Sequence, residues 1–309
     1  MPEPINIYFL GTGGGTPFSG RKFPCIAVKY PPYLIFFDFG ECCQFSLMNS
    51  KIRSFRYNIL ILISHYHADH TTGIPGLLHT LRLINYEHEL TFIGPPGLVN
   101  FIKKISEAFL IGKIGFKLTL LEIIDTFTRT KVYETDKFTI ISFPTEHSVP
   151  SVGYVFHEKD RYKFDEEKAR KLNIPQSNIR KKLLEEGQII IDGKLIKKED
   201  VISHIIPGRK IVYTGDTIPN SEIIEASKNA DLLIHEANYL ESEREEAIIR
   251  KHSTVDMAIQ VAKKADVKRL ALVHLSSRYK DIESIMDYVN NLNINFEVYI
   301  PRDGDIISV

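Results

Sequence analysis

Cysteine, net charge and long apolar runs are all scarce in this sequence of 309 residues. Lys and Arg total 39 and Asp and Glu total 39, so any contact with nucleic acid must come from a local patch. The only cysteines are Cys25 and the adjacent pair Cys42 and Cys43. They have no C-x-x-C spacing, which argues against a thiolate metal site and for a reducing compartment. No apolar run approaches the roughly 18 residues of a membrane span, and the N-terminus lacks a basic segment followed by an apolar one. We therefore expect a cytoplasmic protein that does not contact a membrane.

The stretch ILILISHYHADH organises the chain. Ile59–Ile63 is an unbroken apolar run, which is typical of a buried strand. His65, His67, Asp69 and His70 follow it within a few positions. Four polar side chains at a strand end are costly to bury unless something binds them, and imidazole with carboxylate suits zinc, manganese or iron. A histidine-rich surface loop is the alternative, and the compact H-x-H-x-D-H spacing argues against it.

Three further candidate ligands also come directly after predicted strands: His147, Asp216 and His274. Side chains at the ends of neighbouring strands gather at one edge of packed sheets, so we expect a single site there. An aspartate in that position has two oxygens and can bridge two cations about 3.5–4 Å apart.

Several motifs together resemble those of a known family. SHYHADH resembles the signature of the metallo-β-lactamase superfamily. The rest narrows the resemblance to ribonuclease Z, the tRNA 3′-end endonucleases. These motifs are G-T-G-G-G near the start, D-F-G-E at 38–41, G-D-T at 215–217, H-E-A at 235–237 and H-S-T at 252–254. The resemblance covers essentially the whole chain.

The resemblance implies an α/β protein with the metallo-β-lactamase fold. This is a four-layer αββα sandwich, here a single domain over 1–309 with an inserted exosite arm at about 157–210. That segment has 14 Lys or Arg against 10 Asp or Glu, a local excess of +4. A solvated insertion with no special role is the plainer interpretation. The resemblance instead assigns it to clamping tRNA through basic side chains that contact phosphates: Lys163, Lys168, Arg170, Lys171, Arg180, Lys181 and Lys182.

The resemblance also implies roles for the candidate ligands. Two Zn²⁺ per subunit are expected, with Mn²⁺ or Fe²⁺ as alternatives. The first ion would take His65, His67, His147 and Asp216. The second would take Asp69, His70, His274 and Asp216.

Asp69 would also be catalytic, orienting a water molecule and accepting its proton. Glu236 and His252 would form the pair that protonates the leaving group. The expected activity is removal of the 3′ trailer from precursor tRNA by a homodimer, leaving a 3′-hydroxyl on the tRNA. Asp38 has two interpretations, either a turn cap or a partner that fixes a ligand histidine. We further expect Ser253 to cap the helix that follows it, with Asp256 in the reciprocal position.

The sequence departs from the family pattern in two places. Many members have P-x-K-x-R-N after the glycine turn, in a loop assigned to reading the discriminator end and the CCA sequence. Here Pro17 and Arg21 are retained, but the lysine and asparagine positions are not. The Gly-Pro pair usual in the arm is also absent after Ile174-Pro175.

Other functions remain open on the residues alone. The same ligands would serve a phosphodiesterase of small diesters, a thioesterase or a lactamase. A non-catalytic RNA-binding homologue is an alternative from another class, although an intact ligand set argues against it. We treat four histidines as ordinary, namely His79, His88, His157 and His204, and consider His235 only as a neighbour of the site.

Overall fold

The computed structural model describes residues 3–309 apart from 17, 19, 53, 280–281 and 293. Pro17, which enters the sequence expectations, therefore lies outside the described residues. The chain divides into two compact units. The larger contains residues 1–157 and 210–309, and the smaller is Glu158–Arg209, within the segment where we expect the arm.

Six strands from the N-terminal half and one from the C-terminal end build a seven-stranded sheet in the larger unit, in the order β20-β1-β3-β4-β5-β6-β7. Strands β20, β1, β3 and β4 pair antiparallel, and β4 to β7 pair parallel. The strands are β1 (Asn6–Gly11), β3 (Cys25–Tyr30), β4 (Tyr33–Phe37), β5 (Asn58–Leu62), β6 (Leu90–Gly94), β7 (Leu118–Glu122) and β20 (Ile306–Ser308). Its helices are α1 (Cys43–Asn49), α2 (Ala68–Thr71), α3 (Ile74–Leu83) and α4 (Leu98–Ala108), with a short 3-10 helix η1 (Ser54–Arg56).

A second seven-stranded sheet has the order β19-β17-β16-β15-β10-β9-β8. Its strands are β8 (Thr130–Glu134), β9 (Phe138–Pro144), β10 (Val152–Glu158), β15 (Lys210–Tyr213), β16 (Leu232–Glu236), β17 (Arg269–Val273) and β19 (Glu297–Tyr299). Its helices are α8 (Ser221–Ser227), α9 (Arg244–Arg250), α10 (Val255–Lys264) and α11 (Ile282–Asn290), with a 3-10 helix η2 (Glu241–Glu243). Two short strands, β2 (Gly13–Gly14) and β18 (Leu275–Ser276), pair with each other.

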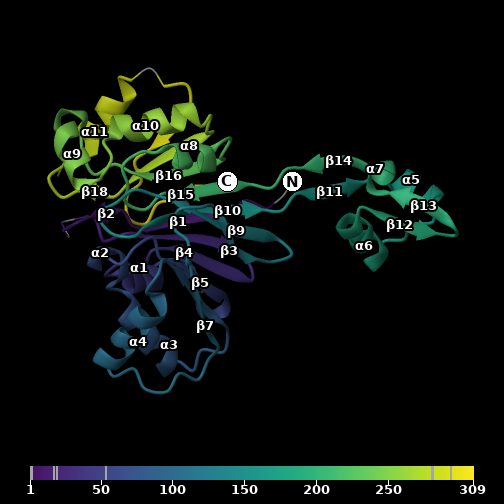
Figure 1. The fold of residues 1–309 in the computed structure, drawn as a ribbon, viewed down its shortest axis with the longest axis horizontal. Coiled ribbons are helices and arrows are strands. Elements are labelled where there is room, and N and C mark those ends of the chain that lie inside the picture. Colours follow the sequence, from purple (N-terminus) through teal and green to yellow (C-terminus); the bar gives the residue numbers. More distant parts are fainter. Residues whose placement is uncertain (1–2, 17, 19, 53, 280–281, 293) are drawn as a thin grey trace. The chain divides into compact units, whose positions relative to one another are not determined.

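The two sheets face each other across one apolar core. Along β4, Ile35 and Phe37 pack into this core, whereas Leu34 and Phe36 pack under the helices α1 and α3. This alternation is what a strand buried on both faces requires. Helices α8 and α10 cover the outer face of the second sheet, and α3 and α4 cover that of the first (Figure 1). The expected four-layer αββα sandwich is confirmed.

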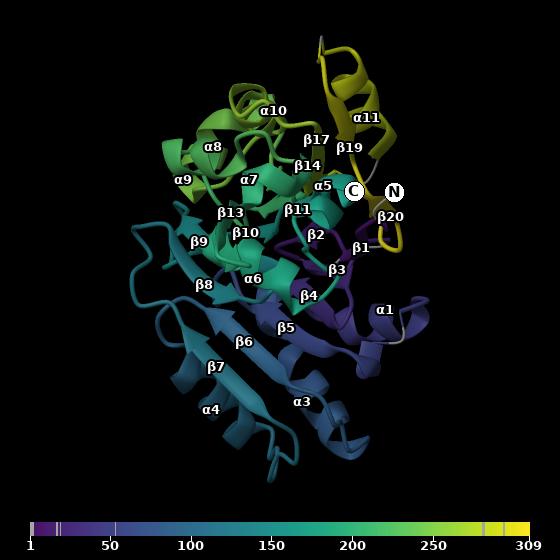
Figure 2. The ribbon, with the colours of Figure 1, turned by 90° about the vertical axis from the view of Figure 1, so that its right-hand side faces the viewer.

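The smaller unit has its own core, formed by Ala169, Ile174, Leu183, Ile189, Ile196 and Val201. Its elements are β11 (Arg161–Phe164), α5 (Glu166–Lys171), α6 (Asn178–Glu186), β12 (Gln188–Ile191), β13 (Lys194–Lys197), α7 (Lys198–Val201) and β14 (Ile202–Ile206). Asp165 and Ser177 cap the N-termini of α5 and α6, and Gly187 ends α6 in the left-handed conformation. Figure 1 shows α6 beside the β12–β13 hairpin, and Figure 2 shows β5, β6 and β7 side by side in the first sheet of the larger unit.

Two local expectations are wrong. The cap of α10 is Thr254, whose side chain accepts a hydrogen bond from the backbone N–H of Met257. Ser253 instead donates its hydroxyl to the carbonyl of Thr217, at 2.6 Å. The second concerns the cysteines, because Cys25 and Cys43 form a buried disulfide with their Cα atoms 5.7 Å apart. The expectation of reduced cysteines did not foresee this pairing between β3 and α1.

Candidate active site

A cluster of three imidazoles forms the first part of the site. His65 Nε2 lies 3.0 Å from His67 Nδ1, and His147 Nε2 lies 3.2 Å from the same atom. His65 and His67 follow β5, and His147 follows β9, so strands of both sheets deliver them. Nitrogen atoms this close, with no carboxylate among them, are the donor set of a cation such as zinc.

A second cluster stands beside the first. His274 Nε2 lies 3.3 Å from Asp69 Oδ2 and 3.3 Å from His70 Nε2. His274 follows β17 and has φ 57, a left-handed conformation that turns the chain at the strand end. A Cβ atom on Gly14 would lie 2.2 Å from the His274 ring, so only glycine fits there.

Asp216 lies between the two clusters. Its Oδ2 is 3.2 Å from His274 Nε2, 3.4 Å from His70 Nε2 and 3.9 Å from His65 Nε2. Its Oδ1 is buried and has no hydrogen-bond partner among the described residues. A buried oxygen without a partner is costly, and a bound cation would satisfy it. The donor set around this carboxylate therefore fits divalent metal ions.

Burial and neighbouring charged side chains together shift the pKa values of the buried site residues. Burial alone would raise the pKa of Asp216, but His274 and His70 outweigh it and hold that pKa well below its ordinary value. Burial likewise disfavours a charged His70, yet Asp216 and Asp38 raise its pKa well above normal. His65 has less compensation, so burial and the neighbouring His70 lower its pKa. A neutral imidazole is the form that can bind a cation.

Asp38 contacts His70 of the second cluster and holds the orientation of its ring. Its Oδ2 lies 2.7 Å from His70 Nδ1 and accepts hydrogen bonds from Ser64 Oγ at 2.8 Å and Tyr213 Oη at 2.6 Å. Of the two interpretations of Asp38, contact with a candidate ligand is the one the structure shows. Ser64 also reaches His65 Nδ1, at 2.9 Å. A carboxylate on the second nitrogen of a ligand histidine sets its tautomer and orientation.

Glu236 and His252 form a close pair. His252 Nδ1 lies 2.8 Å from Glu236 Oε1, and Glu236 also accepts hydrogen bonds from the backbone N–H groups of Thr217 and Asn238. Burial lowers the pKa of His252, but Glu236 and Asp216 overcome this and raise it to about 9. At neutral pH this imidazole is therefore a protonated acid in the metal-free protein.

Sequence reasoning missed two supporting contacts. Asn238 places its side-chain nitrogen 2.9 Å from His274 Nδ1, and Gly15 donates its backbone N–H to Asp69 Oδ2 at 2.9 Å. Asn238 comes just after strand β16, in the same way that the candidate ligands come just after their strands. This position in the sequence was the signal that could have identified Asn238. Nothing local in the sequence marks Tyr213 as a partner of Asp38, because 175 positions separate them.

The structure separates the other histidines from the site. His79, His88, His157 and His204 belong to none of the possible ligand groups found among the described residues. His235 is fully buried, with Nδ1 2.7 Å from the carbonyl of Glu236, and it also belongs to none of the possible ligand groups in the described part of the chain.

Arg21 does not face the site. It is buried and donates from Nη1 to Thr12 Oγ1 at 2.5 Å and to the Pro301 carbonyl at 3.1 Å. The resemblance assigned the surrounding loop to substrate recognition. The one basic residue retained from that pattern is instead part of the fold.

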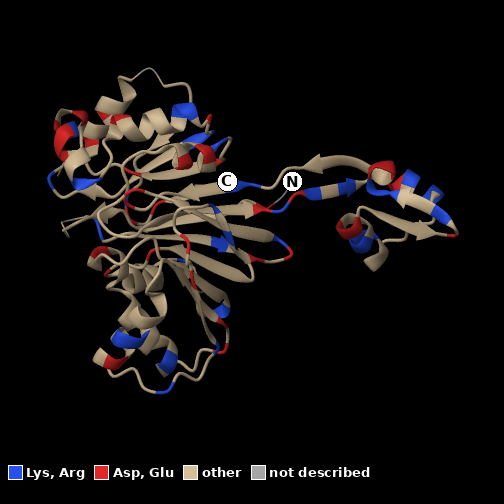
Figure 3. Cartoon of the chain, viewed as in Figure 1, with Lys and Arg blue, Asp and Glu red and all other residues tan. Residues whose placement is uncertain are grey.

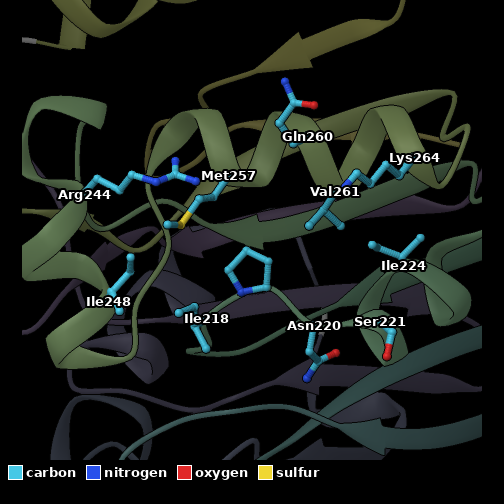
Figure 4. Close-up of a pocket in the computed structure, with 11 residues that line it drawn as sticks. Ile218, Asn220, Ser221, Ile224, Arg244, Ile248, Met257, Gln260, Val261 and Lys264 are labelled. Atoms are coloured by element: carbon cyan, nitrogen blue, oxygen red, sulfur yellow. The ribbon is translucent and has the colours of Figure 1, made fainter.

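The site opens into a cavity of about 290 Å³. His67, Asp69, Asp216, His252 and His274 line it, together with Tyr239, Arg250 and Arg278 at its rim. A larger cavity of about 570 Å³ lies between α8, α9 and α10. Figure 4 shows that aliphatic side chains such as Met257 and Val261 line this larger cavity, with Arg244 and Lys264 beside them. It contains none of the predicted site residues.

Comparison with known proteins decides the family. A ribonuclease Z of Thermococcus kodakarensis is 37% identical over 311 aligned residues, covering 98% of this chain and 95% of its own. A ribonuclease Z of Nitrosopumilus maritimus is 36% identical over 278 residues, covering 90% of this chain and 91% of its own. The chain belongs to the ribonuclease Z family.

Two broader comparisons agree on the fold. A family model described as a β-lactamase superfamily domain matches residues 183–275. The crystal structure of the short form of human tRNase Z superposes with a TM-score of 0.69 at 24% identity, covering 98% of this chain and 99% of that one. The sandwich is therefore the metallo-β-lactamase fold, as the sequence motifs predicted. No described helix of this ribonuclease Z homologue is both long and apolar enough to cross a membrane.

Proposed function

We propose that this chain is a metal-dependent endoribonuclease that removes the 3′ trailer from precursor tRNA and leaves a 3′-hydroxyl on the tRNA. The observation that supports the proposal is a cluster of all the candidate ligands in a chain 36% identical to a ribonuclease Z over 90% of its length. Both clusters of candidate ligands, the carboxylate between them and the Glu236–His252 pair come together at one edge of the sandwich.

Two Zn²⁺ ions per subunit suit the donors, with Mn²⁺ or Fe²⁺ as alternatives. His65, His67, His147 and Asp216 would hold the first ion, and Asp69, His70, His274 and Asp216 the second. Divalent cations held there lower the pKa of water and offset negative charge on a phosphate.

The protein groups supply the proton transfers. Asp69 keeps one carboxylate oxygen on the Gly15 N–H and His274, which fixes its orientation. It accepts the proton of the attacking water and aims that water at phosphorus. On the other side of the phosphate, His252 donates its proton to the departing 3′ oxygen of the tRNA. Glu236 orients His252 and stabilises its cationic form.

The arm would bind the body of the tRNA. Figure 3 shows Lys and Arg positions, in blue, along the ribbon of the smaller unit. Arg180 is tied to Glu166 Oε1 at 2.7 Å and lies 4.7 Å from the centre of the Phe164 ring, so it helps to build the arm. Lys181 and Lys182 are more exposed and pair only loosely with glutamates, at 3.8 Å. These two lysines are better placed to reach phosphates.

We also propose a cytoplasmic homodimer. The family relationship supports the dimer, and a newly transcribed RNA substrate supports the location. The Cys25–Cys43 disulfide removes the support that the cysteine count alone gave to a reducing compartment. Light scattering of the purified protein would test the dimer.

Cleavage of a 3′-extended precursor tRNA, with and without chelator, tests the proposal. Bis(p-nitrophenyl) phosphate should be assayed alongside it. We expect chelator-sensitive cutting at the 3′ end of the tRNA body. Turnover of the small diester without cleavage of the precursor would contradict the tRNA assignment and favour a phosphodiesterase of small substrates.

A further inference from the structure

The guanidinium of Arg278 lies over an aromatic ring at the rim of the active-site cavity. Its guanidinium carbon is 4.3 Å from the centre of the Tyr239 ring, a contact typical of a cation–π pair. Tyr239 is 6% exposed, whereas the Arg278 side chain is 43% exposed. One face of the guanidinium is therefore covered by Tyr239, and much of the rest of the side chain meets solvent.

The edge of the same guanidinium is already engaged. Nε donates to Ser276 Oγ at 3.1 Å, and Nη1 lies 3.1 Å from Glu243 Oε1. Tyr279 donates its hydroxyl to the other oxygen of Glu243 and accepts the backbone N–H of Leu240. Two in-plane donors are thus occupied before substrate arrives. These contacts hold the guanidinium in place beside Tyr239, where a base can meet its plane.

The segment that carries Arg278 is joined to the catalytic turn. Strand β18, just before it, pairs with β2, and Thr16 Oγ1 lies 2.7 Å from Ser277 Oγ. The same turn donates the Gly15 N–H to Asp69. The segment that carries Arg278 is therefore linked to the turn that contacts Asp69, the residue proposed to act on the attacking water.

The position of His252 indicates which nucleotide would meet this face. In the proposed reaction His252 gives its proton to the 3′ oxygen of the last nucleotide that stays on the tRNA. The Tyr239 ring lies 6.0 Å from the His252 ring, and both rings border the cavity whose rim includes Arg278. The retained nucleotide should therefore lie on the Tyr239 side of His252.

We propose that Arg278, stacked on Tyr239, forms a platform on which the base of this last retained nucleotide stacks. The inference rests on the proposed function and adds a specificity-determining residue to it. Arginine planes and aromatic rings are common stacking surfaces for unpaired bases. The inward orientation of Arg21 strengthens the inference, because that arginine cannot serve the 3′ end of the tRNA.

Substitutions of Arg278 separate stacking from simple charge attraction. Arg278→Ala removes the plane, and Arg278→Lys keeps the charge but not the plane. We expect both variants to raise KM for a 3′-extended tRNA on the order of tenfold, with a smaller change in kcat. Arg244→Ala is the matched control, because Arg244 is also exposed and paired with a glutamate but lines the cavity of Figure 4. It should behave as wild type.

A precursor with an abasic site at the last retained nucleotide gives the decisive comparison. In the wild type this substrate should show the same rise in KM, and in Arg278→Ala it should show no further rise. A merely structural role would leave the two effects independent. Melting temperatures of all variants would identify any loss of folding, and Arg278→Lys provides a second readout if Arg278→Ala is unstable.

Two outcomes would overturn the platform. Full rescue by lysine would assign Arg278 to a charge contact with a phosphate. Variants indistinguishable from Arg244→Ala would remove Arg278 from recognition altogether. If the wild type itself leaves precursor tRNA uncut, the proposed function fails instead, and the two failures are thus distinguishable.

Discussion

The metal-site edge of the larger unit and the smaller unit are both rich in ionisable groups, yet they are held in opposite ways. At the site, His65, His70 and Asp216 are buried, and neighbouring side chains set their charges. In the smaller unit, Lys181 and Lys182 stand at the surface with exposed glutamates one helical turn away. Buried pairs depend strongly on each partner, whereas exposed pairs are worth little individually.

This difference predicts how each region responds to mutation. Removing one buried partner leaves another charge or polar atom unsatisfied, so the effect spreads through the cluster. Removing one exposed charge changes long-range attraction to a polyanion and little else. Substitutions at the site should therefore act on catalysis and metal binding. Those in the smaller unit should act on affinity and its salt dependence.

The largest effect should come from Asp216→Ala. Both proposed ions would lose a shared ligand, so we expect kcat/KM for precursor tRNA to fall on the order of 10³-fold or more. Metal content per subunit, measured by mass spectrometry, should fall as well. Asp125→Ala changes an exposed carboxylate in a turn and should leave both quantities unchanged. Near-normal turnover by Asp216→Ala would rule out the two-ion site.

The second-largest effect should come from His252→Gln, with kcat about 10²- to 10³-fold lower because a general acid is removed.

The variant Glu236→Gln tests the pairing of Glu236 with His252 through the pH dependence of kcat. In the metal-free protein, burial lowers the pKa of His252, but Glu236 and Asp216 raise it from 6.5 to about 9, so the Glu236 carboxylate favours the protonated acid. Without the carboxylate, activity should decline at lower pH, nearer 6.5.

The same shift has a consequence for stability. A histidine whose pKa is raised on folding stabilises the metal-free protein fully below pH about 6.5. That contribution is lost as the pH rises through about 9. Unfolding by urea across this range should show the loss in wild type and a smaller one in Glu236→Gln. A kcat profile whose alkaline limb is identical in the two proteins would argue against His252 as the acid.

Asp38→Asn should have an intermediate effect. It weakens the contact that orients His70, and such supporting carboxylates typically change metal affinity 10- to 100-fold. Competition with a chromogenic chelator measures this affinity. Asp231→Asn alters another well-packed aspartate, one that accepts the Lys210 N–H away from the site, and provides the control. Equal affinities in the two variants would mean that Asp38 only supports the fold.

The two regions also differ in what the sequence could predict. Helix α6, from Asn178 to Glu186, can be recognised locally, because a serine cap, a glycine stop and the spacing of apolar residues all lie in or beside the segment. The candidate ligands were found by a different local signal, namely histidine or aspartate directly after an apolar strand. The fold then brings them together, which local signals alone could not specify.

Contacts between distant segments could not be predicted. Tyr213 meets Asp38 across the two sheets, and Cys43 at the start of α1 meets Cys25 at the start of β3. The capping of α10 failed for a more local reason. Ser253 and Thr254 are both good caps, and a tertiary hydrogen bond from Ser253 to Thr217 decides between them. The inward orientation of Arg21 likewise depends on Pro301, at the far end of the chain.

The smallest effect should come from reversing charge on the arm. Lys181→Glu with Lys182→Glu leaves the caps and apolar face of α6 intact, so the helix should persist. If each lysine contacts a phosphate, KM for precursor tRNA rises several-fold, and the slope of log KM against log salt falls by about 1 per lost contact. Lys103→Glu with Lys104→Glu makes the same change on two exposed neighbours of α4 in the larger unit. An equal change in slope for both pairs would show that net charge matters rather than the arm. A change confined to the Lys181 and Lys182 variant would instead show that the smaller unit contributes to tRNA affinity. Its exposed, weakly paired lysines suit that role, whereas the buried groups of the site do not.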